Sequence, residues 1–172
     1  MKFISVYKNV IKPVIDVVLA SVTLLLLSPV MLVIALMLAA NNRGTPFFVQ
    51  NRPGKNGKIF SIIKFKTMNN KKDAQGVLLP DYRRLTFMGK IVRKTSLDEL
   101  PQLINVVKGD MSLVGPRPPL PSEVKEYLPW HKMRLAVTPG LTCLWQVSGR
   151  SDIGFEDWMR LDNQYVRHGN LG

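Results

Sequence analysis

Residues 14–40 form an almost unbroken apolar run, in which Asp16 is the only charged residue. A helix of this length extends for roughly 40 Å at about 1.5 Å per residue, whereas the hydrocarbon core of a bilayer is about 30 Å thick. The run is also far longer than the apolar part of a cleaved signal peptide. The sequence therefore predicts a helix near the N-terminus that associates with a membrane.

Ser28-Pro29 lies near the middle of this run. Proline lacks a backbone N–H and clashes with the carbonyl four residues earlier, so we expect a helix that is bent or broken here. Because positive residues flank both ends of the run and such residues stay on the cytoplasmic side, we predict a re-entrant helix, broken at Ser28-Pro29, that enters and leaves on one face. A single kinked span with the N-terminus outside is the alternative. The flanking residues are Lys2, Lys8 and Lys12 before the run, and Arg43, Arg52, Lys55 and Lys58 after it.

The basic residues are concentrated directly after the apolar run. Residues 43–94 contain 13 lysines and arginines against 2 acidic residues, in a chain whose formal net charge is +12. Such a stretch suits anionic lipid headgroups, nucleotide phosphates or nucleic acid. No helix-turn-helix, RNA-recognition or zinc-finger pattern accompanies it, so nucleic acid is not expected as a partner.

The sequence offers little for disulfide or zinc chemistry. The single cysteine, Cys143, excludes an internal disulfide and a cysteine-cluster metal site. His131 and His168 have no partner at metal-ligand spacing, so we expect exposed side chains and no zinc site. Walker A, GxGxxG and nucleophile-elbow motifs are also absent from the sequence.

The remaining residues are predicted to form a small α+β domain. Residues 47–50 and 59–68 have the composition of strands, and the turn-rich residues 51–57 between them predict a β-hairpin. Residues 71–84 are expected to form an exposed loop, and a helix with apolar residues at helical spacing is expected to end at Lys108-Gly109. We therefore expect a mostly helical α+β protein around one short hairpin, with residues 1–42 embedded in the membrane and residues 43–172 forming the catalytic domain.

Two adjacent carboxylates, Asp98 and Glu99, lie at the start of that helix. Ser96 with Glu99 forms a capping box, whereas capping by Asp98 leaves Pro101 within the first turn, where its missing N–H loses no bond; both starts remain open. The two carboxylates can divide labour around one phosphate, one attacking and the other holding a metal ion. The alternative is that they only stabilise the helix start.

Three further segments carry residue types that bind phosphates or bases. Lys64 and Lys66 share one face of an extended strand, and Arg117 stands between two rigid prolines. Residues 145–150, Trp-Gln-Val-Ser-Gly-Arg, combine an indole, an amide and a guanidinium beside a glycine bend. The alternatives are a solvated lysine face, a connector between helices, and a core Trp145 with Arg150 on the surface.

An ordered series of motifs runs along nearly the whole chain. It begins with the apolar segment broken at Ser28-Pro29 and ends with Trp145-Gln146-Val147-Ser148-Gly149-Arg150. Between them lie Phe48-Val49-Gln50-Asn51-Arg52-Pro53-Gly54, Lys64-Phe65-Lys66-Thr67-Met68, Gly89-Lys90-Ile91-Val92-Arg93, Ser96-Leu97-Asp98-Glu99-Leu100-Pro101-Gln102-Leu103, Asn105-Val106-Val107-Lys108-Gly109-Asp110-Met111-Ser112 and Val114-Gly115-Pro116-Arg117-Pro118. The series resembles the bacterial sugar transferases, the monotopic polyprenyl-phosphate phosphoglycosyl transferases, in their small single-domain form.

The resemblance implies a reaction and a location. Such enzymes sit on the cytoplasmic face of the bacterial inner membrane through a re-entrant helix, in contact with membrane lipids. They move a phosphosugar from a UDP-sugar to polyprenyl (undecaprenyl) phosphate and release UMP. Their product begins the assembly of a capsule, O antigen, exopolysaccharide or other glycoconjugate. The sugar, the pathway and the presence of a homodimer are left open.

The resemblance also implies roles for single residues. The first carboxylate of the pair, Asp98, is expected to be the nucleophile that carries a covalent phosphosugar, and Glu99 is expected to bind Mg²⁺. The basic positions of the motifs are expected to bind phosphate and donor; they are Lys64, Arg93, Arg117 and Arg150. Asp162 matches a late acidic position whose role is unclear.

The sequence departs from the family at its end. Family members normally continue through a further helix, so a chain that stops at Gly172 is expected either to be truncated or to lack that helix. A rival reading from another class is a noncatalytic, membrane-anchored module whose basic face binds anionic lipid or nucleic acid. It predicts that Asp98→Asn leaves function intact, whereas the enzyme reading predicts loss of turnover.

Overall fold

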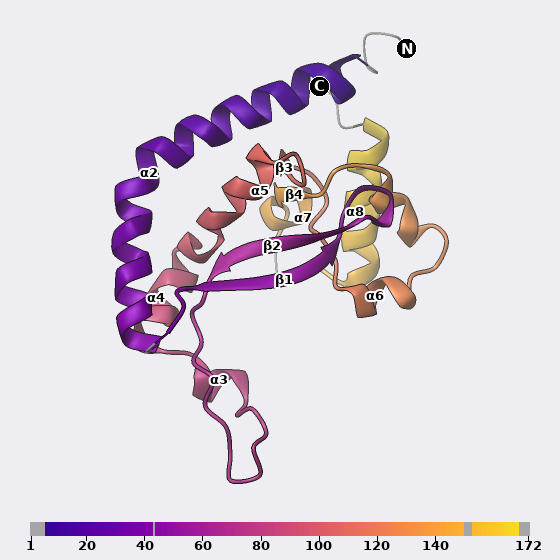
Figure 1. The fold of residues 1–172 in the computed structure, drawn as a ribbon. Coiled ribbons are helices and arrows are strands. Elements are labelled where there is room, and N and C mark those ends of the chain that lie inside the picture. The colour runs from indigo at the N-terminus through magenta and orange to yellow at the C-terminus, as the bar shows by residue number, and fades with distance from the viewer. Residues whose placement is uncertain (1–5, 43, 150–152, 169–172) are drawn as a thin grey trace.

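The computed structural model describes residues 6–42, 44–149 and 153–168 of an α+β protein (Figure 1). A long N-terminal helix arches over a β-hairpin and several short helices. The helices are the π-helical turn Tyr7–Ile11, α2 (Lys12–Asn42), α3 (Asp81–Arg84), α4 (Phe87–Lys94), α5 (Leu103–Val107), α6 (Pro121–Lys125), α7 (Leu144–Val147) and α8 (Phe155–His168). The 3₁₀ helices are η2 (Lys55–Gly57), η3 (Leu97–Gln102) and η4 (His131–Ala136), and the strands are β1 (Phe47–Pro53), β2 (Ile59–Phe65), β3 (Ser112–Val114) and β4 (Gly140–Thr142).

The helix α2 runs without interruption through Pro29, so the predicted break at Ser28-Pro29 is wrong. Pro29 cannot donate to the carbonyl of Leu25, four residues earlier, but the Ser28 hydroxyl donates to that carbonyl at 2.8 Å. This bond replaces the missing one and lets helical backbone continue. Figure 1 shows α2 as two straight arms that meet at a bend, in agreement with the expected distortion.

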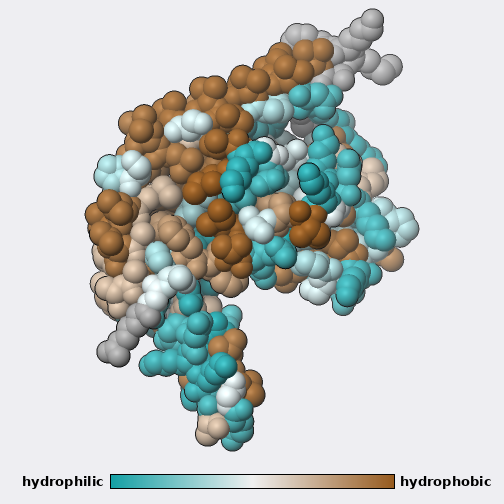
Figure 2. Space-filling model, viewed as in Figure 1, coloured by the Kyte–Doolittle hydropathy of each residue, from teal (hydrophilic) through white to brown (hydrophobic). Residues whose placement is uncertain are grey.

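Only a narrow face of α2 packs against the rest of the protein. Its buried residues are Asp16, Ala20, Ile34 and Leu38. Large apolar side chains cover the opposite face, where Leu25 is 76% exposed and Leu26 is 70% exposed. Figure 2 shows mostly hydrophobic residues along the helix, interrupted by a few pale, more polar ones. By length and composition, Tyr7–Asn42 is able to cross a membrane, and the structure is therefore compatible with membrane association.

The predicted hairpin is confirmed, with different strand ends. β1 and β2 pair antiparallel, so that Phe47 lies opposite Phe65 and Pro53 lies opposite Ile59. β2 ends at Phe65 because the next residues leave the hairpin: the Thr67 carbonyl accepts a hydrogen bond from the Thr86 N–H at 3.3 Å. Residues 71–84, expected to form an exposed loop, extend away from the domain and contain only the short α3.

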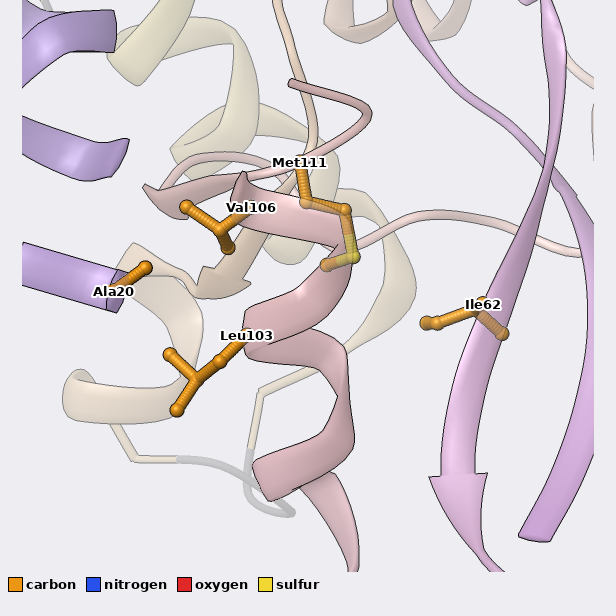
Figure 3. Close-up of a cluster of buried hydrophobic side chains, with 5 residues drawn as sticks. All are labelled: Ala20, Ile62, Leu103, Val106 and Met111. Atoms are coloured by element: carbon orange, nitrogen blue, oxygen red, sulfur yellow. The ribbon is translucent and has the colours of Figure 1, made fainter. Parts of the chain in front are cut away.

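Two hydrophobic clusters join α2 to the domain. The first places Ala20 of α2 and Ile62 of β2 on either side of α5 and the segment after it, which supply the other side chains shown in Figure 3: Leu103, Val106 and Met111. The second contains Ile34 and Leu38 of α2 together with Phe65 and Val92. Each arm of α2 therefore covers a different part of the core.

The predicted helix around residues 96–107 is present, but both predicted caps are wrong. Ser96 adopts a left-handed conformation with φ of 57°, and its side chain makes no capping hydrogen bond. The chain then forms a 3₁₀ helix, and regular α-helix begins only at Leu103, beyond Asp98. Pro101 lies within the 3₁₀ helix and has no N–H to donate there. The expected stop is confirmed, because Gly109 follows α5 with φ of 80°.

Asn105 of α5 holds the hairpin against this helix. Its side-chain oxygen accepts from the Ile63 N–H at 3.2 Å, and its side-chain NH₂ donates to the Ser61 carbonyl at 2.8 Å. The amide therefore satisfies the outer edge of β2 in the way that a third strand would do. Asn105 is only 1% exposed, so its amide is shielded from water and depends on these two backbone partners.

The short strands β3 and β4 pair in parallel and bring two glycines into contact. A Cβ atom on Gly140 would lie 2.1 Å from the Gly115 nitrogen, and one on Gly115 would lie 2.7 Å from the Thr138 carbonyl oxygen. Only glycine fits such a close approach of two backbones. The segment that carries Arg117 leaves β3 at this crossing.

An aromatic cluster around η4 and α8 corrects one expectation. His131 was expected to be exposed, but it is 4% exposed and packs edge-on against Trp130 and Phe155, with ring centroids 4.2 and 5.3 Å apart. Phe155, one of these partners, is distant in sequence, and spacing alone does not reveal it. His168 is exposed as expected. Trp145 is half-buried and packs on Trp158, with ring centroids 5.2 Å apart.

Asn105→Asp tests the role of the amide. Aspartate retains the acceptor for Ile63 but cannot donate to Ser61, and it places a carboxylate against that carbonyl. We expect a loss of about 2 kcal/mol or more in the free energy of unfolding, measured by denaturant unfolding of the detergent-solubilised protein. Asn70→Asp, at an exposed position, is the matched control, with an expected change within about 0.5 kcal/mol. Equal stability of the two variants would contradict this role.

Candidate active site

Asp98 and Glu99 line two different hollows. Asp98 faces a cleft of about 280 Å³ whose other charged lining residues include Lys66 and Arg93. Glu99 faces a narrow crevice of about 10 Å³, which is also lined by Lys64 and Arg117. Consecutive residues in the first turn of η3 point in different directions. Asp98 and Glu99, although adjacent in sequence, therefore line different hollows. The predicted residues Lys64, Arg93, Asp98, Glu99 and Arg117 are thus brought to one region.

An ion pair between Lys64 and Glu99 closes the crevice. Their Nζ and Oε1 atoms are 2.7 Å apart, and the side chains are 19% and 22% exposed. Lys64 lies on β2 and Glu99 on η3, and Asn105 fixes the distance between these elements. The two side chains are therefore already paired with each other across the crevice in this structure.

The loop that carries Arg117 is fixed through its backbone carbonyls. The Pro116 carbonyl accepts from the Gly140 N–H at 2.9 Å, and the Pro118 carbonyl accepts from Arg52 Nη1 at 3.3 Å. The two prolines that flank Arg117 have no N–H, so they can join the loop to its surroundings only by accepting hydrogen bonds at their carbonyls. Because the loop is held from outside, the Arg117 guanidinium lines the crevice on a rigid support.

Arg52 is a site residue that was not predicted to bind phosphate or donor. It lines the crevice, and burial, followed by the charge of Arg117, lowers its pKa. Its Nε is buried without a hydrogen-bond partner among the described residues, as is Nε2 of the neighbouring Gln102. Both residues lie in the quoted motifs, which was the available signal. A crevice with three cations, one carboxylate and unpaired donors favours an anionic ligand.

The carboxyl group of Asp98 is harder to ionise than an ordinary aspartate. Burial raises its pKa above 3.8, and the neighbouring Glu99 raises it further. Lys64 and Arg93 oppose this shift and lower the pKa. The two cations therefore favour the carboxylate form of Asp98, against the larger effect of burial.

Two predicted residues lie elsewhere. Asp162 on α8 is 1% exposed, lines neither hollow and forms an ion pair with Arg134 at 2.7 Å. Burial raises the pKa of Asp162 to about 6, against the opposing effect of Arg134. Arg150 lies outside the described residues.

The carboxylates fit a metal ion only together with a substrate. No group of three or more His, Cys, Asp or Glu side chains that could hold a metal ion occurs among the described residues. Mg²⁺ is commonly held by one or two carboxylates and completed by substrate phosphates and water. Glu99 can supply one such carboxylate, whereas Asp98 faces the other hollow.

Comparison with known proteins gives a consistent family. The sequence model of the family described as bacterial sugar transferase matches residues 7–172. The uncharacterized sugar transferase EpsL of Bacillus subtilis is 45% identical over 148 residues, which are 86% of this chain and 73% of that protein. The exopolysaccharide production protein ExoY of Rhizobium meliloti is 39% identical over 175 residues, covering 91% of this chain and 76% of that protein.

A third relative has a name that states a reaction. The UDP-glucose:undecaprenyl-phosphate glucose-1-phosphate transferase of Caulobacter vibrioides is 41% identical over 143 residues. The aligned part covers 80% of this chain and 54% of that protein, so the chain spans about half the length of this relative.

Replacement of Arg93 tests the electrostatics around Asp98. Because Arg93 lowers the pKa of Asp98, Arg93→Gln is expected to move that pKa to higher pH, so that a larger fraction of Asp98 is protonated at any given pH. The measurement is a pH titration of the ¹³C carboxyl resonance of Asp98 in the detergent-solubilised protein. Lys90→Gln, an exposed position on the same helix, is the control and is expected to leave the pKa unchanged. A pKa that stays constant or falls in Arg93→Gln would contradict the electrostatic account.

Proposed function

Because this chain belongs to the bacterial sugar transferase family, we propose that it transfers a phosphosugar from a UDP-sugar to polyprenyl phosphate and releases UMP. The stated reaction of the Caulobacter relative supports this chemistry. The observation that carries the proposal is the adjacent pair Asp98 and Glu99, which line two neighbouring hollows rich in cations. One such site can serve a soluble donor and a membrane-bound acceptor in turn.

Asp98 is the nucleophile of this proposal. Its carboxylate attacks the phosphorus that carries the sugar, a new O–P bond forms, and the bond to the uridine phosphate breaks, so that UMP leaves. In the second step an oxygen of polyprenyl phosphate attacks the same phosphorus. That step forms the polyprenyl diphosphate sugar and returns Asp98 to its carboxylate form.

The cations of the crevice supply the electrostatic part of the reaction. Lys64, Arg52 and Arg117 reduce the repulsion between a diphosphate and the attacking carboxylate. Arg93 lines the cleft beside Asp98 and favours its ionised form. Arg150 is proposed as a further donor-binding residue on the basis of its motif.

Glu99 is the proposed ligand of Mg²⁺. When bound, Mg²⁺ neutralises charge on the diphosphate and on the departing UMP. Lys64 then has to release Glu99, and the freed ammonium can pair with a phosphate oxygen. The Lys64–Glu99 ion pair therefore keeps both side chains paired until the substrate enters.

The proposed location is the cytoplasmic face of the bacterial inner membrane. Residues 1–42 would form a re-entrant membrane segment, and the exposed apolar face of α2 would contact lipid. Residues 43–172 would form the cytoplasmic catalytic domain. The second hydrophobic cluster joins α2 to Leu97, directly before Asp98, so the membrane helix also sets the position of the nucleophile. The product would begin the assembly of a bacterial surface glycan.

Replacement of the nucleophile tests the reaction. The protein in nanodiscs is mixed with Mg²⁺, polyprenyl phosphate and a panel containing UDP-glucose, UDP-galactose and UDP-N-acetylglucosamine, and UMP release is measured. Asp98→Asn is expected to reduce release by roughly 10⁴-fold or more, because an amide cannot form the covalent intermediate. Asp157→Asn, on the exposed surface of α8, is the matched control and should retain wild-type release.

Two outcomes separate this proposal from a noncatalytic role. The enzyme is supported if the wild type releases UMP with one UDP-sugar and Asp98→Asn releases none. The melting temperature of Asp98→Asn must equal that of the wild type. Wild-type release that persists in Asp98→Asn contradicts the nucleophile. No release from any donor, combined with vesicle binding that falls steeply with salt, would favour an anchored module that binds anionic lipid.

Cysteine labelling tests the re-entrant topology. Val6→Cys and Val77→Cys place thiols at exposed positions before α2 and in the loop beyond β2. The native Cys143 is buried, and burial raises its pKa to about 11, so it reacts slowly. In sealed inverted membrane vesicles, a membrane-impermeant maleimide should label both new cysteines. If the Val6→Cys variant is labelled only after the vesicles are opened, the helix spans the membrane and the re-entrant topology is wrong.

A further inference from the structure

A buried ion pair lies behind the Arg117 loop, outside both hollows. Arg134 of η4 is 2% exposed and Asp162 of α8 is 1% exposed, with Nη2 and Oδ2 2.7 Å apart. The Arg134 guanidinium also lies over the Trp158 ring, 4.8 Å from its centroid. Burial of two charges costs desolvation free energy, and hydrophobic residues of similar volume often stabilise a core equally well. The pair therefore calls for a role beyond stability.

The other contacts of Arg134 indicate that role. Its Nη1 donates to the Tyr127 hydroxyl at 2.8 Å, and its Nη2 donates to the backbone carbonyl of Arg117 at 2.7 Å. Asp162 Oδ2 lies against the same Nη2 that donates to the Arg117 carbonyl, so the charge of the carboxylate attracts this edge of the planar guanidinium. Asp162 in this way aims Arg134 at the peptide that follows Arg117.

The Arg117 carbonyl is the middle one of three that are held from outside. Gly140 and Arg52 bind the carbonyls on either side, as described above, and Arg134 binds the one between them. Loss of the middle bond would leave a buried acceptor unsatisfied and allow the peptide to rotate. Rotation of that peptide changes the direction in which the Arg117 side chain leaves the backbone.

We propose that Arg134, oriented by Asp162, is a positioning residue that fixes the Arg117 guanidinium for the diphosphate of the sugar nucleotide. This inference rests on the proposed function and gives Asp162 a role. Neither residue touches the substrate. Both act through the Arg117 carbonyl, across the loop from the crevice.

Arg134→Lys is the first test. Lysine keeps a positive charge for Asp162, but a single ammonium on a flexible stem cannot hold Asp162 and the Arg117 carbonyl in one fixed plane. With the UDP-sugar that the wild type uses best, kcat/KM is expected to fall about tenfold or more, mainly through KM, because a displaced binding group weakens substrate positioning. Tyr127→Phe removes a different partner of Arg134 and should leave kcat/KM within about twofold.

A double-mutant cycle distinguishes positioning from general damage. Arg117→Gln removes the side chain that Arg134 is proposed to position, so Arg134→Lys should cause little further loss in that background. Asp162→Asn, which keeps the size of the side chain, should behave in the same way and serves if Arg134→Lys does not fold. The inference would be overturned if the fold-losses in kcat/KM of the single variants multiplied in the double variants. It would also be overturned if the single variants kept the wild-type kcat/KM.

The affinity for UDP adds a readout that does not need turnover. Calorimetric titration with UDP should show weaker binding in Arg134→Lys and Asp162→Asn than in Tyr127→Phe, with little difference once Arg117 is replaced. A wild type that neither turns over nor binds any donor contradicts the proposed function, and the inference fails with it. An active wild type with unchanged Arg134 and Asp162 variants contradicts the inference alone.

Discussion

The two hydrogen bonds between the Asn105 amide and the edge of β2 are the contact on which the site depends. A two-stranded hairpin is only marginally stable alone, and its outer edge has unpaired backbone groups. Asn105 satisfies that edge and joins it to the helical segment that begins with η3. The same junction places Lys64 beside Glu99, and it sets the two hollows that meet at Asp98 and Glu99.

The long apolar helix α2 and the site share their supporting contacts. Ala20 of α2 packs in the same cluster as Ile62 of β2 and Leu103 of α5. The strand and the helical segment that carry the site residues are therefore joined to α2 through one cluster. Leu97 packs on the other cluster directly before Asp98. In the proposed enzyme, the depth of α2 in the bilayer would therefore determine how close Asp98 lies to the phosphate of a membrane-bound acceptor.

The sequence predicted those features that depend on interactions between residues close together in the chain. The hairpin, the stop at Gly109 and the proline-fixed position of Arg117 each follow from turn residues, glycine conformation or proline geometry. The sequence did not predict the continuous helix through Pro29, where the Ser28 hydroxyl donates to the Leu25 carbonyl that Pro29 cannot reach. It also missed Arg52 and Arg134, which reach carbonyls 66 and 17 residues away. Such bonds depend on tertiary packing, and no residue spacing encodes them.

A trapped intermediate tests the central claim most directly, namely that Asp98 carries the phosphosugar. The purified protein is mixed with Mg²⁺ and its UDP-sugar in the absence of polyprenyl phosphate, quenched and digested, and the peptides are analysed by mass spectrometry. The account predicts a phosphosugar adduct on the peptide that contains Asp98, formed together with an equal amount of UMP. An adduct on another residue, or UMP that appears only with acceptor and without any adduct, would contradict it.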